Sequence, residues 1–266
     1  MQNTLYNLRL LDDLGAGSTW IHHLHPVIKI LVTAIYLIAI MSFGRYEVAA
    51  LMPFFVYPFL ILGWAELPAK PVLNRIALVS PLIIGIGIIH PFIDSHHIAV
   101  GNMQFSRGWI TFLSLFIKSS LTVSAAILLI ATTGMSNLAA GLRKLGVPKI
   151  FVIQLLLTYR YIAVLGEEAS RMQRAYQLRA PRQRGIARAV WGSFAGQLLL
   201  RTFDRAYRVY QAMSLRGFAG EYYNGDPGSI NRRDAVYLTA WSLFFITARV
   251  YNLPLLWGSL LTGRPL

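Results

Sequence analysis

Long apolar runs separated by short polar stretches dominate the first half of the chain. Four runs predict membrane-spanning helices, at residues 27–43, 48–64, 75–89 and 109–133. Their lengths approach the roughly 17–25 residues that a helix needs to cross the hydrocarbon core of a bilayer. A fifth span is expected within 235–261. The pattern therefore predicts an all-α integral membrane protein with about five transmembrane helices.

Residues 134–234 differ, because basic residues are interleaved there with apolar helical sequence. This block holds 16 of the 25 Lys and Arg residues and 6 of the 11 Asp and Glu residues. The positive-inside rule assigns such a block to the cytoplasm, and four preceding spans place the N-terminus inside and the loop 90–107 outside. Nucleic-acid binding is disfavoured for a basic block embedded in a membrane chain. We expect a membrane domain at 1–133, a cytoplasmic helical domain at 134–234 and a final span within 235–266.

One segment of the basic block complicates the count of spans. Residues 150–165 are mostly apolar, but sixteen residues give only about 24 Å of helix, less than the ~30 Å hydrocarbon core. We interpret them as a helix packed under the membrane domain or at its interface; a sixth crossing is the alternative. Residues 186–215 predict one long helix. Gly192 and Gly196 in it have the spacing of a close helix crossing, a spacing that also occurs by chance.

Two stretches of the block match when they are offset by 37 residues. Each has an acid four residues before an arginine, an order that stabilises a helix, and then Leu-Arg before a small residue. Pro181 ends the first copy and Gly217 the second, as helix stops do. The repeat predicts two similar helices, each with an arginine at its C-terminal tip. The matched pairs are Glu167 and Asp204, Arg171 and Arg208, Ala175 and Ala212, and Arg179 and Arg216.

The composition agrees with a membrane protein. Hydrophobic residues make up 55% of the 266 residues, charged residues only 14%, and the mean hydropathy is +0.50. Soluble domains usually carry about 25% charged residues. The chain has no cysteine, which excludes disulfides and thiolate chemistry. Residues 1–26 lack the order of a cleavable signal peptide, so we expect none.

Candidate chemistry is sparse. The sequence has no G-x-x-x-x-G-K-[ST] loop, no G-x-S-x-G elbow and no H-E-x-x-H pair. We expect no catalytic residue, no bound cofactor and no metal site in this chain. His90, Asp94, His96 and His97 lie in the predicted outer loop; cobalt or nickel could bind such groups, but their spacing matches no ligand signature and a solvated loop is the simpler interpretation. Lys118 lies inside the fourth span, where it faces protein or water or else snorkels to the interface.

A set of short motifs follows in order between residues 132 and 218. They are Thr132-Thr133-Gly134, Leu145-Gly146-Val147-Pro148-Lys149, Leu157-Thr158-Tyr159-Arg160-Tyr161, Glu167-Glu168, Leu178-Arg179 and Met213-Ser214-Leu215-Arg216-Gly217-Phe218. Together they resemble the transmembrane T component of energy-coupling factor transporters, the family that includes the CbiQ subunit of cobalt uptake systems. The combination is specific, whereas each motif alone is weak, and the resemblance covers about residues 26–220.

The resemblance implies a non-catalytic subunit of a transporter in a bacterial or archaeal cell membrane. It would couple two cytosolic ATP-binding-cassette ATPases, similar to CbiO, to a substrate-binding membrane subunit similar to CbiM; a small accessory membrane subunit is left open. ATP would be bound by the partner ATPases. In this family the arginines of two X-Arg-X motifs, at the ends of crossing coupling helices, dock into grooves of the ATPases. Carried over, the docking residues are Leu178, Arg179, Ala180, Leu215, Arg216 and Gly217.

The chain departs from the family pattern in places. The family often has Asp-Pro-Arg-x-Lys before the first span, where this chain has His25-Pro26-Val27-Ile28-Lys29, so no role of that acid is carried over. The long loop 90–107 and the ending at Gly220 favour the cobalt or nickel branch, with a vitamin T component as the alternative. Two rivals from other classes are an intramembrane lipid-modifying enzyme, which needs polar catalytic residues in its bundle, and a stand-alone secondary transporter, which usually repeats across its spans.

Overall fold

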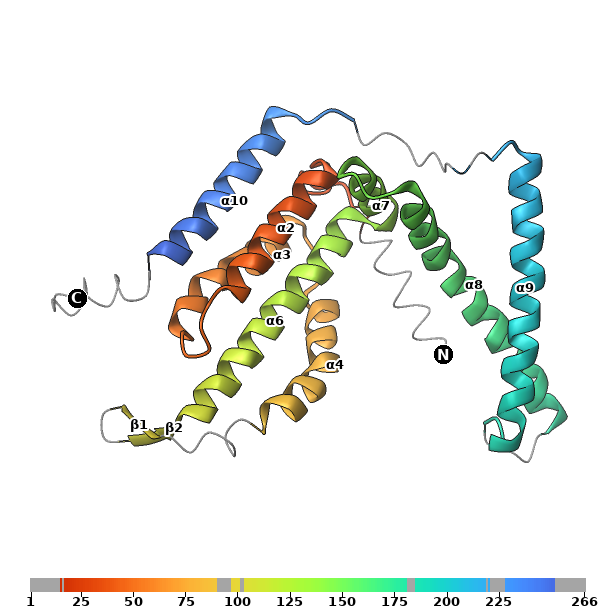
Figure 1. Cartoon of the computed structure of the whole chain (residues 1–266), viewed down its shortest axis with the longest axis horizontal. Coiled ribbons are helices and arrows are strands. Elements are labelled where there is room, and N and C mark those ends of the chain that lie inside the picture. The colour runs from red at the N-terminus through yellow and green to blue at the C-terminus, as the bar shows by residue number, and fades with distance from the viewer. Residues whose placement is uncertain are drawn as a thin grey trace. The chain divides into compact units, whose positions relative to one another are not determined.

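The computed structural model describes residue 15 and residues 17–89, 97–100, 103–180, 185–218, 220 and 228–251. These residues are helical apart from turns and one short hairpin (Figure 1), as predicted for an all-α membrane protein. They divide into two compact units, one from residues 15–134 and 228–251 and the other from residues 135–220. The division rests on contacts between residues. The functional domain boundaries at residues 134 and 234 stay a prediction.

The first unit, called here the membrane unit, brings the start and the end of the chain together. Across it the helices follow the order α10, α2, α6 and α4 (Figure 1), and each packs against the next. Strands β1 and β2 pair antiparallel in the predicted outer loop, with His97 opposite Ser106. The elements are α2 (Pro26–Met41), the 3-10 helix η1 (Ala49–Phe55), α3 (Val56–Trp64), α4 (Ala69–Gly87), β1 (His97–Val100), β2 (Met103–Ser106), α6 (Arg107–Thr133) and α10 (Arg232–Val250).

Only some of the predicted spans are long apolar helices. Among the described residues, α4, α6 and a third helix of the other unit are long and apolar enough to cross a membrane, whereas α2 and the η1–α3 segment are shorter. The predicted fifth span begins as α10 at Arg232, and its part after residue 251 lies outside the described residues. Helix α10 is not among the three, because Arg232, Arg233, Asp234 and Arg249 dilute its apolar sequence.

The second predicted span starts as a 3-10 helix rather than an α-helix. Pro53 lies inside η1, and Pro58 lies in the first turn of α3. Because Pro58 has no N–H, the carbonyl of Phe54 loses its helical donor four residues on. The hydroxyl of Tyr36 donates to that carbonyl at 3.0 Å. A neighbouring helix thus satisfies a group that proline frees, as a membrane interior requires.

The core of the membrane unit is aromatic. Tyr36, Phe54, Tyr57, Trp241 and Phe245 are buried, and their ring centroids lie 4.6–5.9 Å apart in the contacting pairs. Such pairs contribute about 0.5–1.5 kcal/mol beyond the apolar area that they bury. Since the rings come from α2, η1, α3 and α10, this cluster fastens the last helix onto the first two.

Two lysines of the membrane unit bind backbone carbonyls at or just beyond the end of a helix. Lys118 of α6 donates to the carbonyls of Phe43 and Gly44 at 2.7 and 3.2 Å, just past the end of α2. This geometry favours the protein-facing alternative for Lys118 over snorkelling. At the opposite end, Lys29 of α2 donates to the carbonyl of Thr132 at 2.8 Å, in the last turn of α6. The last carbonyls of a helix lack backbone donors and carry negative partial charge, so Lys29 stabilises the end of α6. Lys118 instead satisfies two carbonyls of the turn that follows α2.

Candidate functional site

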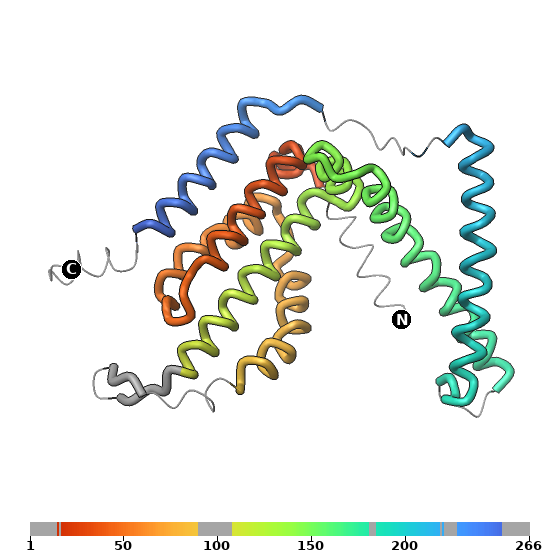
Figure 2. Tube along the Cα trace, viewed as in Figure 1, coloured from red at the N-terminus to blue at the C-terminus, as the bar shows by residue number. Residues whose placement is uncertain are grey.

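The second unit, called here the coupling unit, is built from two long helices that cross. It contains α7 (Met135–Lys144), α8 (Lys149–Arg179), the 3-10 turn η2 (Arg188–Val190) and α9 (Trp191–Leu215). The green α8 and the cyan α9 run in opposite general directions (Figure 2). Glu168 of α8 and Arg201 of α9 form an ion pair and mark where the two helices meet.

The helix boundaries differ from two predictions. The segment 150–165 does not form a helix of its own, because α8 continues through Gly166 to Arg179 over 31 residues. A single interior glycine costs a helix only about 1 kcal/mol and does not end it. By length and composition α8 could cross a membrane, although Arg160 lies in its apolar half. The long helix predicted from residue 186 begins at Trp191, after the η2 turn.

Both predicted arginine tips are helix ends. Arg179 is the last residue of α8, and Ala180 leaves the helix with φ −128° and ψ 66°. Arg216 is the C-cap of α9. Each arginine is exposed, and the leucine before it is almost fully exposed, Leu178 at 84% and Leu215 at 89%. An exposed guanidinium group next to an exposed leucine side chain is typical of residues that bind in a groove of a partner protein.

The end of α9 has a specific backbone geometry. Gly217 has a φ of +75°, its N–H bonds the carbonyl of Ser214 at 3.0 Å, and the N–H of Phe218 bonds the carbonyl of Met213 at 3.0 Å. This is the Schellman pattern, in which a left-handed residue, here glycine, closes the helix. Arg216 therefore occupies a fixed cap position. The residues that follow Ala180, up to 184, lie outside the described residues, so the closing geometry of α8 is known only up to its C-cap.

The crossing sends the two tips in opposite directions. Arg179 lies roughly 17 Å along α8 beyond Glu168, and Arg216 lies roughly 23 Å along α9 beyond Arg201, at 1.5 Å rise per residue. Among the residues that the structure describes, neither Arg179 nor Arg216 forms an ion pair or a side-chain hydrogen bond. The six predicted docking residues thus form two separate exposed sites rather than one.

Glu168 holds the crossing electrostatically. One of its oxygens accepts a hydrogen bond from Arg201, and the other lies 3.1 Å from Arg171. Glu168 thus pairs with Arg171 within α8 as well as with Arg201 of α9. The hydrogen bond from Arg201, aided by the charges of Arg171 and Arg205, lowers the pKa of the Glu168 carboxyl.

Helix α9 carries an apolar face that the sequence-based assignment of the site missed. None of its residues is buried. A periodic signal was available, because Phe203, Tyr207 and Tyr210 recur at the three- and four-residue spacing of one helix face. A groove of about 500 Å³ lies between α8 and α9, and Phe218, folded back by the Schellman motif, lines it together with Met213. Exposed faces of this kind mark contacts with a partner or with lipid.

Metal ligands do not gather in the described part of the chain. No group of three or more His, Asp or Glu side chains there could hold a metal ion. His90, Asp94 and His96 lie outside the described residues, and His97 begins β1. Lys118, the polar residue that an intramembrane enzyme could have used, binds carbonyls at the end of α2.

The chain is similar to known transport proteins. The family model of CbiQ, described as "Cobalt transport protein", matches residues 17–225. Nickel permease LarQ of Lactiplantibacillus plantarum is 29% identical over 138 residues, so the match spans half of each chain. An uncharacterised protein of Methanocaldococcus jannaschii is 27% identical over 222 residues, 79% of this chain and 81% of that protein. Cobalt transport protein CbiQ of Rhodobacter capsulatus is 35% identical over 96 residues, 35% of this chain and 38% of that protein.

Proposed function

Because the chain belongs to the CbiQ family of cobalt transport proteins, we propose that it is the coupling subunit of an energy-coupling-factor importer. In this role it passes the ATP-driven motion of two cytosolic ATP-binding-cassette ATPases to a substrate-binding membrane subunit. It binds no nucleotide and catalyses no reaction itself; ATP belongs to the ATPases. The substrate is cobalt or nickel, the metals named for the family model and for the LarQ and CbiQ relatives.

The observation that carries the proposal is the pair of exposed tips. Each joins an arginine that has no ion-pair partner among the described residues to an almost fully exposed leucine at the end of a long helix. An arginine at a helix end also compensates the helix dipole, by about 0.3–1 kcal/mol, but that role does not require a bare leucine beside it. Tips that point in opposite directions suit two separate ATPase subunits, one for each arginine.

The guanidinium group fits this task chemically. It presents five N–H donors in a rigid plane, so it can satisfy several carbonyls or carboxylates of a groove at once. A lysine at the same position would offer a point charge with fewer directed bonds. The leucine beside each arginine supplies apolar contact area that excludes water from those hydrogen bonds.

The apolar face of α9 and the groove beside it give the substrate-binding subunit a place to bind. Phe203, Tyr207 and Tyr210 are each about two-thirds exposed. On this proposal the coupling unit lies on the cytoplasmic side, where the positive-inside rule assigns its basic residues. Helix α8 then lies at the membrane interface with its apolar half covered by the partner or by lipid.

Co-purification with the ATPases tests the proposal. The chain is expressed with its ATPases and substrate subunit, and the ATPase that stays bound after detergent extraction is measured. We expect Arg179→Glu/Arg216→Glu to lose most of the bound ATPase, because each change puts a negative charge into a groove built for a cation. Arg174→Glu/Arg208→Glu is the matched control, with the same charge change at exposed positions of the same helices.

The two single variants add a second criterion. If each arginine serves its own ATPase, Arg179→Glu and Arg216→Glu should each leave about half of the wild-type ATPase bound. Equal loss in the control double variant would assign the effect to overall charge. Wild-type ATPase retention in Arg179→Glu/Arg216→Glu would refute the docking assignment.

A further inference from the structure

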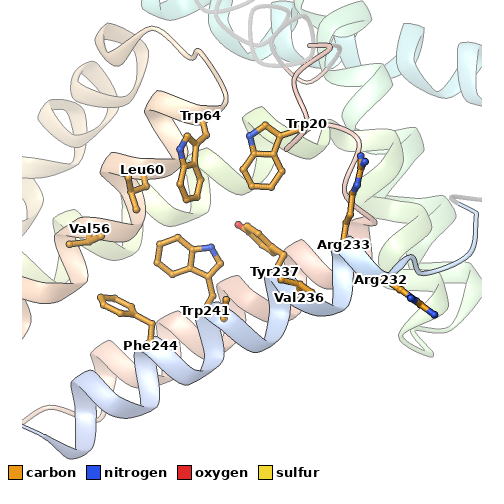
Figure 3. A pocket seen from close by; sticks show the side chains of 11 residues that line it. Trp20, Val56, Leu60, Trp64, Arg232, Arg233, Val236, Tyr237, Trp241 and Phe244 are labelled. Atoms are coloured by element: carbon orange, nitrogen blue, oxygen red, sulfur yellow. The ribbon is translucent and has the colours of Figure 1, made fainter.

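A groove of about 740 Å³ opens on the membrane unit between α3 and α10. Its volume is within the roughly 300–1,000 Å³ of small-molecule sites. Figure 3 shows four aromatic side chains facing one another across it, Trp20, Trp64, Tyr237 and Trp241. The ring centroids of Trp20 and Trp64 lie 5.4 Å apart, and those of Trp64 and Trp241 lie 6.5 Å apart. This groove lies outside the coupling unit and plays no part in the proposed docking.

The two ends of the groove differ in chemistry. At the N-terminal end of α10, Arg232 and Arg233 line the groove together with Trp20 (Figure 3). At the other end the lining is wholly apolar, with Val56, Leu60 and Phe244. Among the residues that the structure describes, Arg232 and Arg233 form no ion pair. The positive end of the groove, which is rich in tryptophan, matches the headgroup of an anionic lipid, and the apolar end matches its acyl chain.

The length of the groove also fits a lipid. From Arg233 to Phe244 helix α10 rises roughly 17 Å, about half of the ~30 Å hydrocarbon core and hence about one leaflet. Tryptophan is enriched where hydrocarbon meets headgroups, and arginine near a helix end reaches phosphate there. A transmembrane helix of a partner would need an apolar surface along its whole length, and the arginine rim would leave it facing a cation.

We propose that this groove binds one anionic glycerophospholipid, with its phosphate at Arg233 and Arg232 and an acyl chain along Val56, Leu60 and Phe244. The first free N–H groups of α10 add positive potential at the same end. The carboxylate of Asp234 does not line the groove, because it is buried and accepts from the backbone of His25 and Asn231. In the orientation proposed above, the lipid belongs to the cytoplasmic leaflet.

Tryptophan quenching by brominated lipids tests this inference. Trp109, Trp191 and Trp257 are replaced by Phe, so that only the three groove tryptophans report. The full chain is reconstituted in phosphatidylcholine vesicles that contain equal fractions of either brominated phosphatidylglycerol or brominated phosphatidylcholine. We expect phosphatidylglycerol to bind the quenching site about twenty-five-fold more tightly than phosphatidylcholine, about fivefold for each of the two arginines.

Two variants make the test specific. Arg233→Gln should reduce the preference to about fivefold, whereas Lys70→Gln, which removes an exposed cation in the first turn of α4, should leave it unchanged. Ala240→Phe, placed inside the groove, should weaken quenching by both lipids. Equal quenching by both lipids in the wild-type background, or an equal loss in Arg233→Gln and Lys70→Gln, would overturn the site. Quenching by neither lipid would mean that protein fills the groove and would also overturn it.

Discussion

The backbone N–H of His25 donates a 2.9 Å hydrogen bond to Oδ1 of Asp234, a residue 209 positions later. The other oxygen of Asp234 accepts from the N–H of Asn231 at 2.8 Å, within the capping box of α10. His25 in turn caps α2, because its Nδ1 accepts from the N–H of Val27 at 3.2 Å. Where the family often has an acid before the first span, this chain has a histidine cap and receives its carboxylate from the last helix.

Asp234→Ala should destabilise the membrane unit by about 2–4 kcal/mol, because it leaves two N–H donors without their acceptor at a site that is only 4% exposed. Thermal unfolding of the purified protein in detergent measures the loss. Asp234→Asn keeps one acceptor oxygen and should recover about half of it. Equal stability of Asp234→Ala and wild type would show that the link between the two helices contributes nothing.

Tyr36→Phe should cost about 1–3 kcal/mol, although it removes a single oxygen. That oxygen is the donor to the Phe54 carbonyl that Pro58 frees. Tyr251→Phe is the control, because the Tyr251 side chain is exposed and forms no hydrogen bond among the described residues. The midpoint of thermal unfolding should fall for Tyr36→Phe only, and a parallel fall in both variants would contradict the assignment.

Gly217→Ala should loosen the tip that carries Arg216. A side chain at a φ of +75° costs about 1–2 kcal/mol. Hydrogen exchange of the amides of Gly217 and Phe218 should therefore be about five- to thirtyfold faster, with binding of the corresponding ATPase weakened. Gly196→Ala is the control within the same helix, where a Cβ meets no described atom within 4 Å and should slow exchange. Unchanged exchange in Gly217→Ala would rule out the Schellman cap.

The crossing of α8 and α9 should weaken in acid. The pKa of Glu168 is lowered in the folded chain by its hydrogen bond from Arg201, so its stabilisation is complete above the unfolded value of about 4.3. It is lost as the pH falls through the lower folded pKa. Solvent reaches the pair, because the side chains of Arg201 and Glu168 are 51% and 17% exposed, so the effect is below about 1 kcal/mol. Spin-label distances across the crossing, followed from pH 7 to pH 3, should widen for wild type and stay constant for Glu168→Gln.

The sequence predicted those features that local rules control. Apolar runs located α2, α4 and α6, and the repeat located both arginine tips, because helix stops are encoded next to them in Pro181 and Gly217. The prediction did not extend to contacts that depend on tertiary packing. Nothing near Lys118 in sequence indicates that it binds carbonyls 74 and 75 residues away, and Glu168 gives no sign of its partner Arg201. The sequence also did not reveal that α8 continues through Gly166, because tertiary context decides whether a glycine ends a helix.

The absence of buried residues along α9 has a consequence for the degradation of this protein in the cell. A 25-residue helix without a single buried residue resembles a partly unfolded segment to the enzymes that survey newly made proteins. A copy synthesised in excess of the proposed ATPases and substrate subunit would therefore be degraded rather than stored. Its abundance in the membrane would then follow the supply of those subunits, even at a constant rate of its own synthesis.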